Sequence, residues 1–102
     1  MTKKSTIEFE DMNLQVGVRV QLMSSQSIDP AVRYTTLIGF VTGEYLLLKI
    51  PQESASLQEG ESLTIRVFSG VSVFTFSSKI ESIIKAPWAF MLLTFPASIH
   101  KV

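Results

Sequence analysis

Alternation of apolar and polar residues runs through most of this chain and restricts its fold more than any other feature. In VGVRVQL (16–22) every second residue is apolar, and ESLTIRVF (61–68) repeats the pattern. Successive side chains of a β-strand point to opposite faces, so this period of two is typical of a strand with one buried face. The sequence therefore predicts a fold built from β-strands.

Six runs of this kind follow one another, and we predict a strand for each of them: 16–22, 32–41, 45–50, 61–68, 71–85 and 88–95. Gly43, Gly70 and Pro87 mark tight hairpins between consecutive runs. Only STIEFEDMN (5–13) looks helical, because Ser5 and Glu8 have the spacing of a capping box. We expect no more than one or two helical turns there.

The alternation slips inside the fifth run, which bears on how the strands are arranged. Val73 has one parity and Phe74 and Phe76 the other, while Ile83 and Ile84 are adjacent. A β-bulge that shifts the register by one residue explains the slip, and bulges are common where a sheet curls. A long bent strand suits a small closed barrel, and a sheet continuing over the corner of a sandwich is the competing arrangement. We predict an all-β fold, a six-stranded antiparallel β-barrel with a short N-terminal helical turn.

Composition argues against most kinds of active site. The chain has no cysteine, its one histidine is His100, and its nine basic residues balance nine acidic ones. Neither a nucleophile motif nor a glycine-rich phosphate loop is present, and the acidic residues are scattered. We therefore predict no catalytic, cofactor-binding or metal site, and a protein that is not an enzyme. The neutral balance also speaks against nucleic-acid binding, because proteins that grip phosphates are usually basic.

No signal peptide or membrane-spanning run is visible in the sequence. The N-terminus has a lysine pair but no apolar stretch behind it, and no apolar run reaches the length of about 18 residues that a spanning helix needs. The absence of cysteine suits a reducing compartment. We predict a cytoplasmic location without membrane insertion.

Several apolar side chains fall on the expected outer parity of their strands and form a candidate interaction surface. They are Leu37, Val41, Leu47, Phe68 and Met91, with Trp88 as a further anchor. Either a bulge flips the parity of such residues, or they form an apolar patch that another surface buries. Trp88 has the same two interpretations, packing in the core or rim, or anchoring a partner.

The order of these features resembles the N-terminal domain of YcgR-type flagellar brake proteins, the PilZN domain. The resemblance extends from about Leu14 to Ile99 and rests on the joint spacing of Gly17, Gly39, Gly43, Pro51, Leu57, Gly60, Val67, Gly70, Phe76, Pro87 and Pro96. It implies a six-stranded split β-barrel. It also implies one half of a two-domain receptor for cyclic di-GMP, in which a C-terminal PilZ domain follows the barrel.

This chain departs from the family pattern in the motifs that bind the nucleotide. The family's nucleotide-binding RxxxR linker and DxSxxG-like motif are absent from this chain. We therefore expect residues 1–102 to be one YcgR-like N-terminal domain without its PilZ domain, an excised half, with a natural stand-alone barrel as the rival interpretation. Cyclic di-GMP is expected to bind only when the linker and PilZ domain are present.

The resemblance implies a regulatory, protein-binding role in motility or a related surface behaviour. The partners it implies are the PilZ domain of the same protein, a second copy of the chain, and a component of the flagellar motor or another target protein. The alternative is a stand-alone split-barrel binding protein, either a scaffold or a flavin-binding protein. The sequence speaks against flavin, because no cluster of Arg, Lys, Ser and Thr is placed to hold its phosphate.

Overall fold

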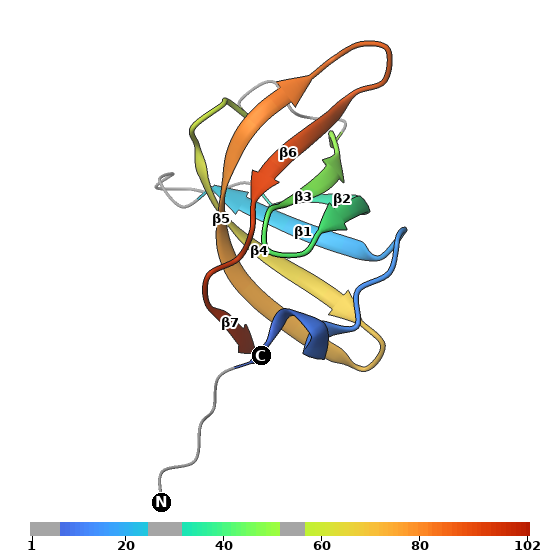
Figure 1. Ribbon diagram of the computed structural model, residues 1–102, viewed down its shortest axis with the longest axis vertical. Coiled ribbons are helices and arrows are strands. Elements are labelled where there is room, and N and C mark those ends of the chain that lie inside the picture. Colours follow the sequence, from blue (N-terminus) through green and yellow to red (C-terminus); the bar gives the residue numbers. More distant parts are fainter. Residues whose placement is uncertain (1–6, 25–31, 52–56) are drawn as a thin grey trace, which may run out of the picture.

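The fold is a closed β-barrel with one short helical turn at its N-terminal side (Figure 1). The computed structural model describes residues 7–24, 32–51 and 57–102. In chain order the elements are η1 (Phe9–Met12), β1 (Arg19–Ser24), β2 (Val32–Val41), β3 (Tyr45–Lys49), β4 (Ser62–Ser69), β5 (Ser72–Ile84), β6 (Phe90–Thr94) and β7 (Ile99–Lys101).

Six antiparallel strands close the barrel in the order β1-β2-β3-β6-β5-β4, with β4 paired back to β1. The pairing divides into two sheets. Sheet A contains β1, β4, β7 and the first parts of β2 and β5. Sheet B contains β3, β6 and the last parts of β2 and β5. The predicted six-stranded antiparallel barrel is confirmed, and its two long strands pass from one sheet to the other.

Each long strand bends at a shift of register. In β5 the shift lies between Ile80 and Ser82, which confirms the bulge predicted for that run. In β2 a second shift lies between Leu37 and Gly39, and the sequence analysis did not foresee it. A bulge adds local twist and redirects the strand, so these two shifts allow β2 and β5 to serve both sheets.

The two buried polar side chains among the described residues close the points where the sheets separate. The Thr35 hydroxyl donates a hydrogen bond to the Lys49 carbonyl, where β3 leaves β2. The Ser78 hydroxyl donates to the Thr94 carbonyl at 2.7 Å, where β6 leaves β5. Each bond satisfies a buried hydroxyl and a carbonyl beyond the last ladder pair, so it holds a gap in the barrel closed.

Replacing either hydroxyl should lower the free energy of unfolding by about 1–2 kcal/mol, the usual cost of losing a buried hydrogen bond. Thr35→Val and Ser78→Ala test this in urea unfolding followed by circular dichroism. Ser77→Ala is the matched control, because Ser77 is the exposed neighbour of Ser78. A midpoint for Ser78→Ala equal to that of the control would show that the hydroxyl does not hold the sheets together.

The barrel interior is filled by apolar side chains from every strand of the ring. Its most deeply buried members are Met12, Val20, Leu22, Leu46, Leu48, Leu63, Ile65, Val67, Ile80, Met91 and Leu93. Alternate residues of each strand supply this core, as the period of two predicted. The outward residues between them are therefore the ones available to form a site.

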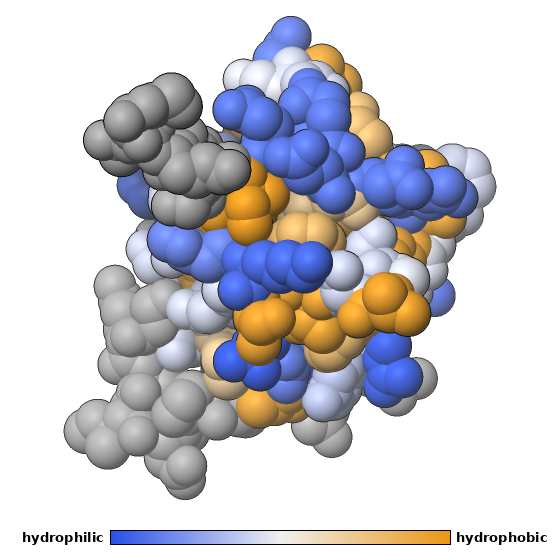
Figure 2. Space-filling model, turned by 90° about the horizontal axis from the view of Figure 1, so that it is seen from below, coloured by the Kyte–Doolittle hydropathy of each residue, from blue (hydrophilic) through white to orange (hydrophobic). Residues whose placement is uncertain are grey.

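The helical turn η1 covers the lower end of the barrel in Figure 1. Phe9 lies with its ring centroid 5.0 Å from that of Phe40 and 4.5 Å from that of Phe95. The Ser69 hydroxyl donates a 2.6 Å hydrogen bond to the Met12 carbonyl and fixes the end of the turn to β4. Seen from this end, apolar surface alternates with hydrophilic side chains (Figure 2).

The predicted helical turn is confirmed, but its capping residues differ from the expected pair. Glu8 is the N-cap, and Glu8 and Asp11 form the reciprocal capping box. The Glu8 backbone N–H donates to Asp11 Oδ2 at 2.9 Å. Carboxylates satisfy the free N–H groups of a helix start as hydroxyls do. Ser5, the cap expected from the sequence, lies outside the described residues.

The C-terminal segment adds a strand beyond the six runs predicted from the sequence. Pro96 follows the sixth run, and β7 then pairs with β5 over Phe74–Phe76. Ile99 is buried, whereas His100 and Lys101 are exposed. A run of three residues is too short to show an alternation, which is why periodicity missed it.

Candidate interaction surface

The structure separates the six sequence-predicted surface residues into different environments. Leu37 and Met91 are 2% and 0% exposed and belong to the core, so both are removed from the candidate surface. The shift after Leu37 reverses the parity of β2, which placed that residue on the wrong face in the prediction. Met91 pairs with Leu48, another core residue, and the wholly apolar runs around them gave no alternation from which to assign a face.

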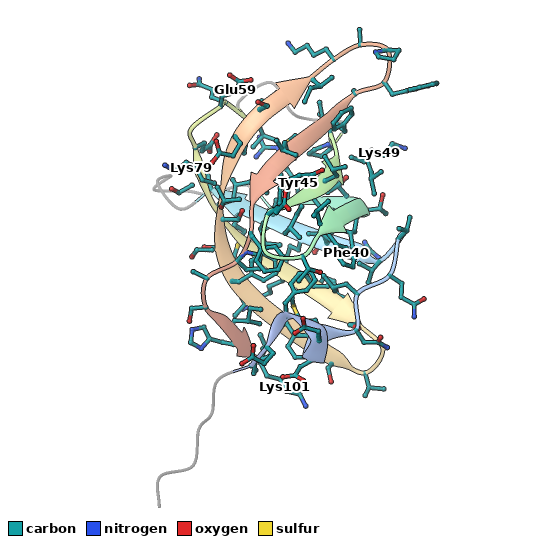
Figure 3. The ribbon with its side chains drawn as sticks, in the orientation of Figure 1. Phe40, Tyr45, Lys49, Glu59, Lys79 and Lys101 are labelled. Atoms are coloured by element: carbon teal, nitrogen blue, oxygen red, sulfur yellow. The ribbon has the colours of Figure 1, made fainter. Side chains whose placement is uncertain are left out.

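Val41 and Leu47 do lie on the outside, on the outer face of sheet B. We define the apolar face by its outward side chains, which are Val41, Tyr45, Leu47, Ile84, Phe90 and Leu92. They are partly exposed, with Val41 the most exposed at 38%. Figure 3 labels Tyr45 and Lys49 on β3, and Phe40 of β2, which packs against the core. Lys49 of β3 and Glu81 at the β5 bulge are exposed charged residues of the strands in sheet B.

The middle row of the apolar face has large side chains at its centre and small ones at its ends. Leu47 pairs with Leu92, and these two are flanked by Gly39 on β2 and Ser82 on β5. A Cβ atom added to Gly39 would meet no heavy atom within 4 Å, and Gly39 does not have a positive φ. Its missing side chain therefore uncovers the flank of Leu47 and serves no turn geometry.

Phe68 and Trp88 do not belong to the apolar face. Phe68 is half-buried on the outer face of sheet A, paired with Arg19 of β1. Trp88 is 78% exposed in the β5–β6 hairpin, after the cis peptide bond between Ala86 and Pro87. The structure thus leaves Val41 and Leu47 together and places Phe68 and Trp88 elsewhere.

Four members of the apolar face escaped the sequence analysis: Tyr45, Ile84, Phe90 and Leu92. Counting two residues back from the predicted outward residue Leu47 would have found Tyr45, which shares its parity. Leu92 could not be found in this way, because Met91 on the opposite parity was assigned to the outside. Ile84 lies beyond the bulge of β5, where the parity of the strand has changed.

The charged side chains of the described residues make separate local contacts and do not gather into a metal site. The Glu59 carboxylate accepts a 2.9 Å hydrogen bond from the Ile83 backbone N–H just beyond the β5 bulge, where Figure 3 shows Glu59 beside the strand. Within the described ranges, no three His, Cys, Asp or Glu side chains gather as a metal site would require. Nor does the described part of the chain contain a helix long and apolar enough to cross a bilayer.

Comparison with known proteins points to one family. Residues 15–96 match the PilZNR family model, described as flagellar protein YcgR. The Bacillus subtilis inhibitor of motility, MotI or DgrA, has a similar solved structure, with a TM-score of 0.73 and 14% sequence identity. That match covers 87% of this chain and 46% of the other, so this chain spans about half the length of its structural relative. No curated protein matches the chain.

Proposed function

Because the chain belongs to the PilZNR family of flagellar protein YcgR, we propose that it is a regulatory, protein-binding domain of a cyclic di-GMP effector that controls motility. In this proposal it catalyses no reaction and works in the cytoplasm. Its partners are a PilZ domain of the same protein, a flagellar motor component or a second copy of the chain. The similarity of its fold to that of MotI, an inhibitor of motility, supports the association with motility.

The observation that carries the proposal is the apolar face. Leu47 and Leu92 lie side by side at its centre, and both remain partly exposed. Contiguous apolar surface of this kind on a soluble domain marks a contact with another surface. Sheet B is therefore the face that we assign to the partner.

Nucleotide binding is assigned to segments other than these 102 residues. The chain has neither the RxxxR linker nor the DxSxxG-like motif of the family's nucleotide site. Arginine suits that site because its planar guanidinium binds phosphate through two hydrogen bonds and stacks on bases. The barrel would then respond to cyclic di-GMP through its contact with the PilZ domain.

Gly39→Glu should abolish the regulatory effect of the protein on swimming while leaving the barrel folded. The new carboxylate would stand beside Leu47, which in turn pairs with Leu92, and a docked partner would have to bury it unpaired. The space next to Gly39 and its ordinary φ make the substitution structurally mild. The measurement is the swimming diameter in soft agar of a strain whose own copy is replaced by the variant.

Val71→Glu is the matched control, because it adds the same charge at a fully exposed site in the β4–β5 hairpin. It should swim like the wild type, and Gly39→Glu should swim like a strain without the gene. Wild-type swimming by Gly39→Glu would remove the apolar face from the proposal. Unchanged swimming in the strain without the gene would contradict the role in motility itself.

A further inference from the structure

The outer face of sheet A differs in chemistry from the apolar face. Its central outward side chains, which we name the arginine face, are Arg19, Gln21, Tyr34, Arg66 and Phe68. They come from three neighbouring strands: Arg19 and Gln21 from β1, Tyr34 from β2, and Arg66 and Phe68 from β4. On β4 and β5 the hydroxyls of Thr64, Thr75 and Ser77 border this group.

Contacts within the arginine face hold one guanidinium in place and leave the other open. The Arg19 guanidinium carbon lies 4.6 Å from the centroid of the Tyr34 ring, a cation–π contact. Gln21 Nε2 donates a 3.4 Å hydrogen bond to the Tyr34 hydroxyl. Arg66 is exposed directly opposite Gln21. Arg19 and Arg66 are thus diagonal neighbours, at the spacing of about 7–8 Å typical of such pairs.

No carboxylate of the described residues is on this face. Glu8, Glu10 and Asp11 lie at η1, Glu44 lies in the β2–β3 turn, Glu59 and Glu61 precede β4, and Glu81 lies at the β5 bulge between Ile80 and Ser82. The chain is neutral as a whole. The described acidic residues therefore lie apart from the two arginines of this face. Neither Arg19 nor Arg66 therefore has a carboxylate of the described residues beside it on this face, and both positive charges are available to a carboxylate of a bound partner.

The residue types on the arginine face are those of protein interfaces. Arginine, tyrosine, phenylalanine and methionine are enriched in interface cores, whereas lysine, glutamate and aspartate are depleted. Met23 of β1 extends the same face next to Thr64. Nucleic acid fits less well, because the one tyrosine of the face already carries Arg19 on its ring and the chain has no excess of positive charge.

We propose that the arginine face binds an acidic segment of a partner protein. Carboxylates of that segment pair with Arg19 and Arg66, which match their planar, two-oxygen geometry. Apolar side chains of the same segment cover Phe68 and Met23. This surface lies on the sheet opposite the apolar face in the ring, so the barrel presents two binding surfaces of different chemistry.

The test is an NMR titration of the isotope-labelled chain with a short synthetic peptide that alternates glutamate and valine. Amide shifts are expected on β1, β2 and β4 around the arginine face, with affinity falling as salt is raised. Arg66→Glu should weaken binding at least about tenfold, which corresponds to the loss of one charge-assisted contact and its replacement by repulsion. Arg66→Gln should weaken binding less.

Lys85→Glu is the matched control, since it makes the same change of charge at an exposed residue just after β5. It should leave the peptide affinity within about twofold of the wild type, because exposed charges away from the contact are largely screened. Three results would overturn the proposal. They are an equal loss of affinity in Lys85→Glu, no binding of the acidic peptide, and equally tight binding of a peptide in which glutamine replaces each glutamate. Tighter binding of a single-stranded DNA oligonucleotide or of anionic lipid vesicles would overturn it in favour of that ligand.

Discussion

Leu37→Asp is expected to unfold the barrel, whereas Gly39→Asp two residues later should leave it folded. Leu37 is 2% exposed and pairs with Leu48 inside the ring. A carboxylate there loses its hydration without gaining a partner, and deletion of the leucine removes core contacts as well. Together these effects cost several kcal/mol, a large part of the about 5–15 kcal/mol that stabilises an ordinary domain. Gly39 points outward into open space.

Far-UV circular dichroism and thermal melting of the two variants check this prediction. The Leu37→Asp chain should lack the β-sheet spectrum and show no cooperative transition, and Gly39→Asp should melt close to the wild type. The comparison also tests the bulge of β2, because an unbroken alternation from Leu37 would put both residues on the same face. A folded Leu37→Asp variant would therefore show that the bulge has been placed wrongly.

Phe9→Ala should have the second-largest effect, a loss of about 3–4 kcal/mol in the free energy of unfolding, typical of a buried phenylalanine. Phe9 is 8% exposed and contacts Phe40 of β2 and the Phe95 ring beyond β6. Its removal opens a cavity between η1 and the barrel end. Urea unfolding followed by far-UV circular dichroism measures the change.

Val16→Ala is the control for this variant, since Val16 is largely exposed and lies in the segment between η1 and β1. Surface substitutions of this kind usually change stability by less than about 0.5 kcal/mol. If both variants unfold at the same urea concentration, the turn is not part of the cooperative unit. In that case the aromatic cluster at the lower end contributes little to the fold.

The strands and their closure could be predicted because alternation is a local property of the sequence. In β1 and β4 the period of two is unbroken, and the predicted inward residues are the buried ones. The bulge of β5 was visible because Ile83 and Ile84 interrupt a long alternation. The bulge of β2 was hidden, because LIGFV reads as an apolar run on either parity and no local signal separates the two faces.

The candidate surface could be predicted only in part, for the same reason. Val41 and Leu47 were assigned to the outside and lie there. Leu37 and Met91 were wrong because each sits in a run of apolar residues where a face is decided by pairing with a distant strand. The arginine face was beyond sequence reasoning altogether. Its two arginines are far apart in the chain and become neighbours through the register of β1 with β4.

The two hydroxyls that close the gaps between the sheets have a wider consequence. Thr35 lies in β2 just before its register shift, and Ser78 lies at the same distance before the shift of β5. Thr35 donates to Lys49, the last residue of β3, and Ser78 donates to Thr94, the last residue of β6. The first strand of each half pairs with the first strand of the other, with Leu22 opposite Ile65, and the third strands pair in the same way, with Leu47 opposite Leu92. The halves β1-β2-β3 and β4-β5-β6 therefore repeat one arrangement of three strands, with the same bulge and the same closing hydrogen bond in each. In the apolar face, Leu47 and Leu92 occupy corresponding positions of the two halves.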